Sequence, residues 1–140
     1  MVPPDLAELC RRYALDAVYV FGSRAREMSA ALQHGRPPRS DSPSDIDIGV
    51  LPRTGARHDA RERARITMAL EGLLANARVD LVILPEAPPF LALDIVSGEL
   101  LVAIDKDRVS EYELYVMRRA GDLAPCERER RRSILAGEAR

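Results

Sequence analysis

The 140-residue sequence predicts an α/β fold, because segments with the pattern of strands alternate with segments that have the pattern of helices. A β-branched and aromatic run at 17–21 stops at a Gly-Ser pair and is followed by helix-favouring residues at 24–28. Residues 45–51 alternate polar and apolar, as a strand does, and residues 57–77 carry apolar side chains at helical spacing. With 46% apolar and 31% charged residues, the chain has the composition of one globular domain, which we expect to span residues 1–140.

The flanking segments complete this prediction. A stretch over 33–44 is rich in Pro, Gly and Ser, has no apolar periodicity and predicts a loop. The almost wholly charged segment 126–132 predicts a solvated helix or a frayed end. The other predicted elements are a helix over 6–13 with Asp5 near its N-cap, a buried strand over 79–84, a helix from Pro88 to Val96 ended by Gly98, a strand over 100–104 and a helix in the tail.

Composition excludes several classes of protein. The formal net charge is -1, so affinity for polyanions needs a local arrangement of charge, and nucleic acid is not expected as a direct ligand. No apolar run approaches the roughly 20 residues that span a bilayer, and no signal-peptide pattern is seen, so a soluble cytoplasmic protein without membrane contact is expected. Cys10 and Cys126 lack metal-binding spacing and are expected to be reduced thiols.

Three aspartates are placed where they could act together. Asp45 and Asp47 are residues i and i+2 of a predicted strand, so their side chains point to the same face. Asp80 lies in an otherwise apolar strand and supplies a third carboxylate if the two strands are neighbours. Because an unpaired buried carboxylate is costly, we expect the three to share divalent cations, and Mg²⁺ or Mn²⁺ suits such oxygen ligands best.

The pair Gly22-Ser23 lies where the first strand turns into a helix. The free N–H groups and the positive dipole end of that helix would face the turn, which suits a phosphate group. Gly22 allows close backbone approach, and the Ser23 hydroxyl adds a donor. We expect Arg24, or alternatively Arg26, to offset charge on the leaving group.

A phosphate cradle beside three carboxylates predicts nucleotidyl transfer. Asp45 and Asp47 would bind the cation that accompanies a nucleoside triphosphate, and Asp80 would help to remove the proton of an acceptor hydroxyl. In-line attack at the α-phosphorus would then release pyrophosphate.

The segments FGSRARE, SDIDIGV and ARVDLVIL, in that order, resemble the minimal nucleotidyltransferase family of the DNA polymerase β-like superfamily. The resemblance is clearest over 18–84 and weaker over 99–115. It implies a polymerase β-like nucleotidyltransferase fold with a mixed central sheet flanked by helices. In the corresponding division of the chain, a catalytic core covers about 17–85, a C-terminal strand and helix about 99–120, and a charged tail 121–140.

The same resemblance implies a cofactor, a substrate and a set of functional residues. Mg²⁺ would be the cofactor, with Mn²⁺ as a substitute, and ATP would be a substrate. The implied functional positions are Gly22, Ser23, Asp45, Asp47 and Asp80, of which the three aspartates would be both catalytic residues and metal ligands.

A partner is implied as well. Small members of the family resemble antitoxins encoded beside a HEPN-domain RNase toxin, in which a tyrosine near the RNase motif receives AMP. A cognate HEPN toxin in a hetero-oligomer is therefore the expected partner, and the small size of the chain favours a protein acceptor. Two alternatives stay open: a small-molecule nucleotidyltransferase of the aminoglycoside-modifying kind, and a non-catalytic antitoxin that acts by binding.

One departure from the family pattern concerns spacing. Residues 24–44 separate Ser23 from Asp45, about twice the usual separation. We interpret the excess as an insertion in the Pro/Gly-rich loop, since long surface loops cost little stability. Such an insertion beside the site could change the choice of acceptor or occlude it.

The two histidines receive no role. Residues Arg53 to His58 match the R-x4-H pattern of HEPN RNases, but Pro52 and Gly55 oppose the helix that the pattern needs. His34 lies in the loop, without nearby partners in the sequence.

Overall fold

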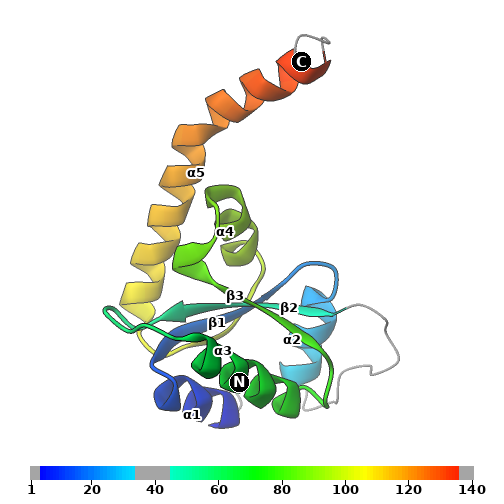
Figure 1. Ribbon diagram of the computed structural model, residues 1–140, viewed down its shortest axis with the longest axis vertical. Coiled ribbons are helices and arrows are strands. Elements are labelled where there is room, and N and C mark those ends of the chain that lie inside the picture. The colour runs from blue at the N-terminus through cyan, green and yellow to red at the C-terminus, as the bar shows by residue number, and fades with distance from the viewer. Residues whose placement is uncertain (1–3, 34–44, 136–140) are drawn as a thin grey trace.

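The computed structural model describes residues 4–33 and 45–135, which contain a four-stranded sheet in the order β3-β2-β1-β4. The strands are β1 (Leu15–Phe21), β2 (Ile46–Pro52), β3 (Val79–Ile83) and β4 (Glu99–Ala103). The helices are α1 (Pro4–Arg12), α2 (Ala25–Gln33), α3 (Ala60–Leu73), α4 (Pro89–Val96) and α5 (Lys106–Leu135), with a 3₁₀ turn η1 over Leu84–Glu86 (Figure 1). Strand β1 is antiparallel to β2 and β4, whereas β2 and β3 are parallel, so the predicted mixed sheet flanked by helices is confirmed.

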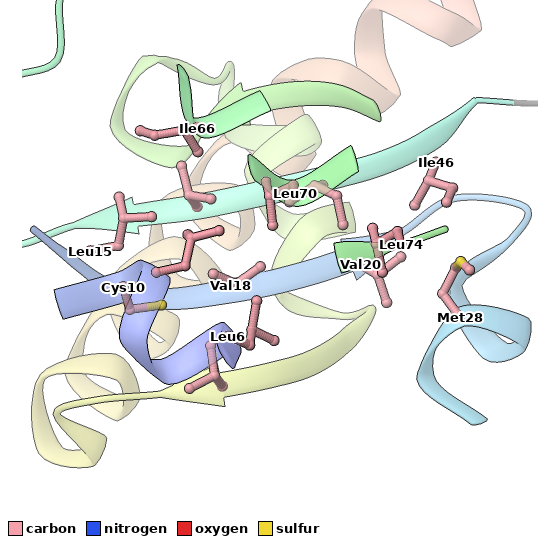
Figure 2. Packing of buried hydrophobic residues seen from close by; sticks show 14 of the residues in the cluster. Leu6, Cys10, Leu15, Val18, Val20, Met28, Ile46, Ile66, Leu70 and Leu74 are labelled. Carbon is pink, nitrogen blue, oxygen red and sulfur yellow. The ribbon is translucent and has the colours of Figure 1, made fainter. Parts of the chain in front are cut away.

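One face of the sheet is covered by α1, α2 and α3. Alternate strand residues such as Val18, Val20 and Ile48 pack there against apolar residues of the three helices. Figure 2 shows Leu6 and Cys10 from α1, Met28 from α2, and Ile66 and Leu70 from α3 among the buried side chains of this cluster. Burial raises the pKa of the Cys10 thiol to about 12, which makes it a packing residue rather than a nucleophile.

The opposite face is covered by α4 and α5. Tyr19 and Phe21 of β1 pack there with Ile95 of α4 and with Val109 and Val116 of α5. The buried Tyr19 hydroxyl donates a hydrogen bond of 2.8 Å to Glu113, which fixes α5 against the sheet. No helix in the described ranges combines the length and the apolar character needed to cross a bilayer.

The helix predicted at 57–77 is shorter in the structure. Asp59 caps α3 by accepting a hydrogen bond of 2.8 Å from the Glu62 backbone N–H, and so sets the first turn. Ala75 and Asn76 have φ values of 55° and 62°, a left-handed backbone that ends the helix. Helix α3 therefore links the parallel strands β2 and β3 as a compact crossover.

The apolar sequence of β3 predicts a buried strand, but most of β3 is only partly buried. It lies at the edge of the sheet, and only Ile83 of its five residues is buried. Leu81 packs on the α1–α3 face and Val82 on the α4–α5 face, so both faces are apolar although one edge is open. The apolar run in β3 therefore indicates that helices cover both faces of the sheet at this strand, and it does not indicate that the strand is central.

The C-terminal part is a single 30-residue helix, α5, which continues through Pro125. The predicted helix thus continues beyond residue 120 into the charged segment 126–132, where a solvated helix or a frayed end was one of the expectations. Tyr112 packs against the core, whereas Tyr115 is exposed. The predicted 33–44 loop lies outside the described residues, except for Gln33, which ends α2.

Candidate active site

The turn after β1 requires the glycine that the sequence supplies. Gly22 has a φ of +80°, and a Cβ atom built on it would lie 2.4 Å from Oδ2 of Asp47. Any larger residue would therefore meet both a strained backbone and the carboxylate. The prediction that Gly22 permits a close approach thus has a specific cause: the Asp47 side chain occupies the space beside the turn.

The three predicted aspartates gather around this turn. Asp47 lies directly opposite Asp80 in the parallel register of β2 and β3, and opposite Phe21 in the antiparallel register of β1 and β2. Asp45 precedes β2 by one residue and is exposed. Burial first, and then the charges of Asp80 and Asp45, raise the pKa of Asp47 above its ordinary value. The structure therefore brings the three carboxylates within electrostatic range of one another.

Asp47 and Asp80 lie on the sheet face that carries α4 and α5. The alternation of β2 places Ile46, Ile48 and Val50 on the opposite face, in the cluster with α1 to α3. Gly49, two residues after Asp47, faces Ile95 of α4, since a Cβ there would lie 2.4 Å from that side chain. Helix α4 thus covers the middle of this face and leaves the aspartates beyond its edge.

The donor set fits a hard divalent cation in its chemistry. Carboxylate oxygens are the ligands that Mg²⁺ and Mn²⁺ prefer. The pKa of Asp47 is raised by burial first and then by repulsion from Asp80 and Asp45, and a bound cation would offset both. Within the described ranges, no three acidic, histidine or cysteine side chains are already drawn together as a ready ligand set.

The residues after Gly22 differ in accessibility. Ser23 is exposed at the start of the turn into α2. Arg24 is only 5% exposed, and its guanidinium donates to both carboxylate oxygens of Glu27, at 3.3 and 3.2 Å. Arg26 is exposed and lines the adjoining cavity. Of the two arginines considered from sequence, Arg26 is thus the more accessible to a ligand, and a nucleotide-binding role for Arg24 stays a prediction.

A cavity of about 700 Å³ adjoins the Gly22-Ser23 turn and contains residues that sequence reasoning missed. Besides Arg26, its polar wall consists of Asp94 and Ser97 from the end of α4 and Glu99 from the start of β4. Glu99 is opposite Val20 in the β1–β4 register, which brings this segment beside the turn. The one sign of this part of the cavity in the sequence is the short polar segment 97–99, which lies between the predicted helix and the predicted strand.

Gly98 makes that arrangement possible. A Cβ on Gly98 would lie 2.5 Å from the carbonyl oxygen of Val20 and 3.0 Å from Cβ of Phe21. The predicted role of Gly98 was to end the helix, and the structure adds that it lets the α4–β4 connection approach the end of β1.

The R-x4-H segment forms no helix of the HEPN type. Residues 53–59 connect β2 to α3, and His58 is buried with Nε2 at 2.5 Å from the Tyr13 carbonyl oxygen. His34 lies outside the described residues.

Comparison with known families decides the classification. Residues 5–107 match the family described as Polymerase beta, Nucleotidyltransferase. The chain belongs to this family. The matched residues include the whole sheet and all three aspartates, so the candidate site lies within the nucleotidyltransferase domain. A search of curated proteins gives no significant match.

Solved structures show the same nucleotidyltransferase fold at low identity. A mutant form of a toxin–antitoxin complex, MntA-HpeT, contains a chain with 21% identity and a TM-score of 0.68, over 93% of this chain and 95% of that one. A toxin–antitoxin structure with AMP-PNP matches at 23% identity and a TM-score of 0.65, over 94% and 96%. A complex of a tri-AMPylated HEPN toxin from Shewanella oneidensis with its MNT antitoxin matches at 22% identity and a TM-score of 0.64, over 93% and 92%.

Proposed function

We propose that this nucleotidyltransferase transfers AMP from ATP to a tyrosine hydroxyl of a cognate HEPN-type RNase toxin, and so acts as its antitoxin. The observation that carries the proposal is the pairing of Asp47 with Asp80 on adjacent strands, with Gly22 held against the Asp47 carboxylate. This places acidic side chains beside the turn at which a helix begins, where phosphate groups are favoured.

In the proposed reaction, the Gly22-Ser23 turn orients the triphosphate, and the Ser23 hydroxyl donates to one of its oxygens. A tyrosine oxygen attacks the α-phosphorus, a new phosphorus–oxygen bond forms, and the bond to the β-phosphate bridging oxygen breaks to release pyrophosphate. Asp80, which is exposed, accepts the tyrosine proton. A divalent cation bound by Asp45, Asp47 and Asp80 would neutralise charge on the phosphates.

The cavity beside the turn supplies room for the nucleoside. Its volume of about 700 Å³ is in the range of small-molecule sites. Asp94 and Glu99 can accept hydrogen bonds from ribose hydroxyls or a base amino group, and Arg26 can pair with a phosphate oxygen. We infer that these residues hold the donor nucleotide while the acceptor approaches from the side of Asp80.

The choice of a protein acceptor is supported by the fold relatives. Three chains with the same fold come from toxin–antitoxin structures, one with AMP-PNP and one with a tri-AMPylated HEPN toxin. The Pro/Gly-rich segment before Asp45, interpreted from the sequence as an insertion, would then affect the choice of acceptor.

Intact-mass spectrometry tests the proposal directly. The HEPN-type protein encoded next to this chain would be incubated with it, Mg²⁺ and each nucleoside triphosphate in turn. We expect a gain of whole AMP units with ATP, mapped by fragmentation to a tyrosine, and no gain with Asp45→Asn/Asp47→Asn.

The chain contains its own matched control. Asp105 and Asp107 form a second D-x-D sequence outside the site, and the acceptor role of Asp105 toward the Arg108 backbone N–H suits asparagine equally well. Asp105→Asn/Asp107→Asn should therefore transfer AMP normally. A tight complex without any mass gain would instead indicate an antitoxin that acts by binding, and AMP transfer only to an aminoglycoside would indicate the small-molecule enzyme.

A further inference from the structure

A second cavity, of about 560 Å³, lies at the opposite end of β2 from the aspartates. Its wall is formed by the β2–α3 connection, the start of α3, the end of β3 with η1, and Arg108 near the start of α5. Asp47 and Pro52 are five residues apart along β2, which corresponds to roughly 17 Å. The two cavities share no lining residue.

This cavity is strongly basic in a protein whose formal net charge is -1. Its wall contains Arg53, Arg57, Arg63 and Arg108, and Glu86 is the sole acidic member of the described lining. Glu86 is already paired with Arg63, and Arg108 is paired with Asp16, which lies outside the lining. Arg53 and Arg57 are exposed and have no ion-pair partner within the described ranges. A local excess of positive charge therefore faces the cavity.

Two of the arginines are held in place by the fold. Nε of Arg108 donates to the buried Asp16 at 2.8 Å, and its Nη2 donates to the Pro52 carbonyl oxygen at 3.1 Å. Nε of Arg63 donates to the His58 carbonyl oxygen at 3.0 Å. Side chains that are fixed before binding lose less conformational entropy when a ligand arrives. This part of the wall is thus organised in the absence of any ligand.

The backbone around the cavity also favours an anion. The parallel strands β2 and β3 both end here, and the crevice outside the carboxyl ends of such strands is the usual ligand site of open α/β sheets. Helix α3 begins at the same edge, so the positive end of its dipole adds to the arginine charge. The connection turns sharply at Gly55, with a φ of +82° and a hydrogen bond of 2.9 Å from Ala56 N–H to the Arg53 carbonyl oxygen.

His58 supplies an independent sign of a missing partner. The residue lines the cavity and is 8% exposed, and its Nε2 is bonded to the Tyr13 carbonyl oxygen. Its Nδ1 is buried and has no hydrogen-bond partner among the described residues. Buried nitrogen atoms of this kind are normally satisfied. Because a carbonyl oxygen only accepts, Nε2 is the donor in that contact, and Nδ1 is the ring atom at the cavity that is left without a partner in the described ranges.

We propose that this second cavity binds a phosphorylated small molecule of nucleotide size, held mainly by Arg53, Arg57 and Arg108. The guanidinium group matches phosphate oxygens in a two-pronged geometry, and several guanidinium groups around one cavity suit a ligand that carries more than one negative charge. The volume matches a small-molecule site, whereas an acidic peptide would need an extended groove. The site is separate from the transfer reaction and does not depend on which acceptor that reaction uses.

Amide NMR spectroscopy with pyrophosphate as the probe can distinguish the two sites. The ¹⁵N-labelled chain would be titrated without divalent cations at about 150 mM salt, where exposed charges more than about 8 Å apart are largely screened and direct contacts persist. We expect saturable shifts at the Thr54, Gly55 and Ala56 amides, in the loop that lines the cavity. Arg53→Ala/Arg57→Ala should weaken this binding at least tenfold, and its thermal unfolding should match that of the wild type because both side chains are exposed.

Two control variants make the result specific. Arg61→Ala/Arg65→Ala removes the same charge from exposed positions of α3 outside the cavity wall and should leave the affinity unchanged. Asp47→Asn/Asp80→Asn, in the transfer site, should also leave it unchanged. Shifts confined to Gly22 and Ser23, equal affinity in Arg53→Ala/Arg57→Ala, or saturation by an acidic peptide but not by pyrophosphate would each overturn the proposal.

Discussion

Asp47 links the electrostatics of the candidate site to the stability of the chain. Burial, followed by the charges of Asp80 and Asp45, raises its pKa, so its charged form is less favourable in the folded than in the unfolded chain. The stability that Asp47 contributes is therefore present below its unfolded pKa and is lost as the pH rises through its raised folded pKa. We expect Asp47→Asn to raise the urea midpoint at about pH 7 and to have little effect below about pH 4.

The same substitution should abolish AMP transfer, so stability and activity would change in opposite directions. Urea unfolding followed by circular dichroism at the two pH values provides the measurement. A lower midpoint for Asp47→Asn at neutral pH would show that the carboxylate makes a net stabilising contact, contrary to the repulsion inferred from its neighbours.

Gly22→Ala tests the close contact at the turn. The new side chain would require a left-handed backbone at φ +80° and would lie 2.4 Å from Oδ2 of Asp47. We expect a loss of about 1–3 kcal/mol in the free energy of unfolding, together with reduced AMP transfer. Gly72→Ala in α3 is the matched control, since its Cβ would meet open space and should stabilise the helix by up to about 1 kcal/mol.

The sequence marks an individual residue best where that residue contrasts with its neighbours in the chain. Asp80 stands out in an apolar strand, and the structure places it opposite Asp47. Arg24 and Arg26 carry the same side chain, so the sequence could not separate them. Only the packing, which buries Arg24 against Glu27 and exposes Arg26, distinguishes the two.

Among the elements, α5 is attached to the sheet by one ion pair in addition to its apolar contacts and the Tyr19–Glu113 hydrogen bond. Arg108 in its first turn pairs at 2.8 Å with Asp16, a β1 residue that is 4% exposed. Arg108→Ala would leave that carboxylate buried without its cation, and we expect a cost of about 3–5 kcal/mol in urea unfolding. Asp16→Asn/Arg108→Ala should recover part of the loss, because no buried charge then remains.

The exposed ion pair Arg63–Glu86 provides a comparison for the Asp16–Arg108 variants. Its side chains are 40% and 55% exposed, so Arg63→Ala should cost no more than about 1 kcal/mol. Equal costs for Arg108→Ala and Arg63→Ala would mean that Asp16 finds water or another partner, and that α5 is held mainly by its apolar contacts.

Most elements could be predicted because each carries a local signal. Asp59 caps α3, Pro89 opens α4, and alternation marks β2. The edge position of β3 could not be predicted, since helices on both sides of the sheet give an edge strand the same apolar composition as a central one.

At the scale of the whole molecule, strand order separates two sites that the sequence places close together. Asp47 and Arg53 are six residues apart, yet they lie at opposite ends of β2, one beside the β1–α2 turn and the other at the start of α3. The basic cavity also draws Arg108 from a distant part of the chain. Local patterns do not contain that information, which explains why the aspartate site was predicted and the arginine cavity was not.

Helix α5 has one part that packs on the sheet and one that extends away from it (Figure 1). Val109, Val116 and Ala120 are buried, whereas Leu123 is 39% exposed, and Pro125 removes a backbone hydrogen bond within the helix. A chain ending at Ala124 should therefore unfold cooperatively, within about 1 kcal/mol of the full chain. A chain ending at Asp107 would expose the apolar face beneath α5 and should lose more than about 3 kcal/mol. Urea unfolding of both chains provides the measurement, and a large loss on removing residues 125–140 would mean that the distal part of α5 contributes to the core.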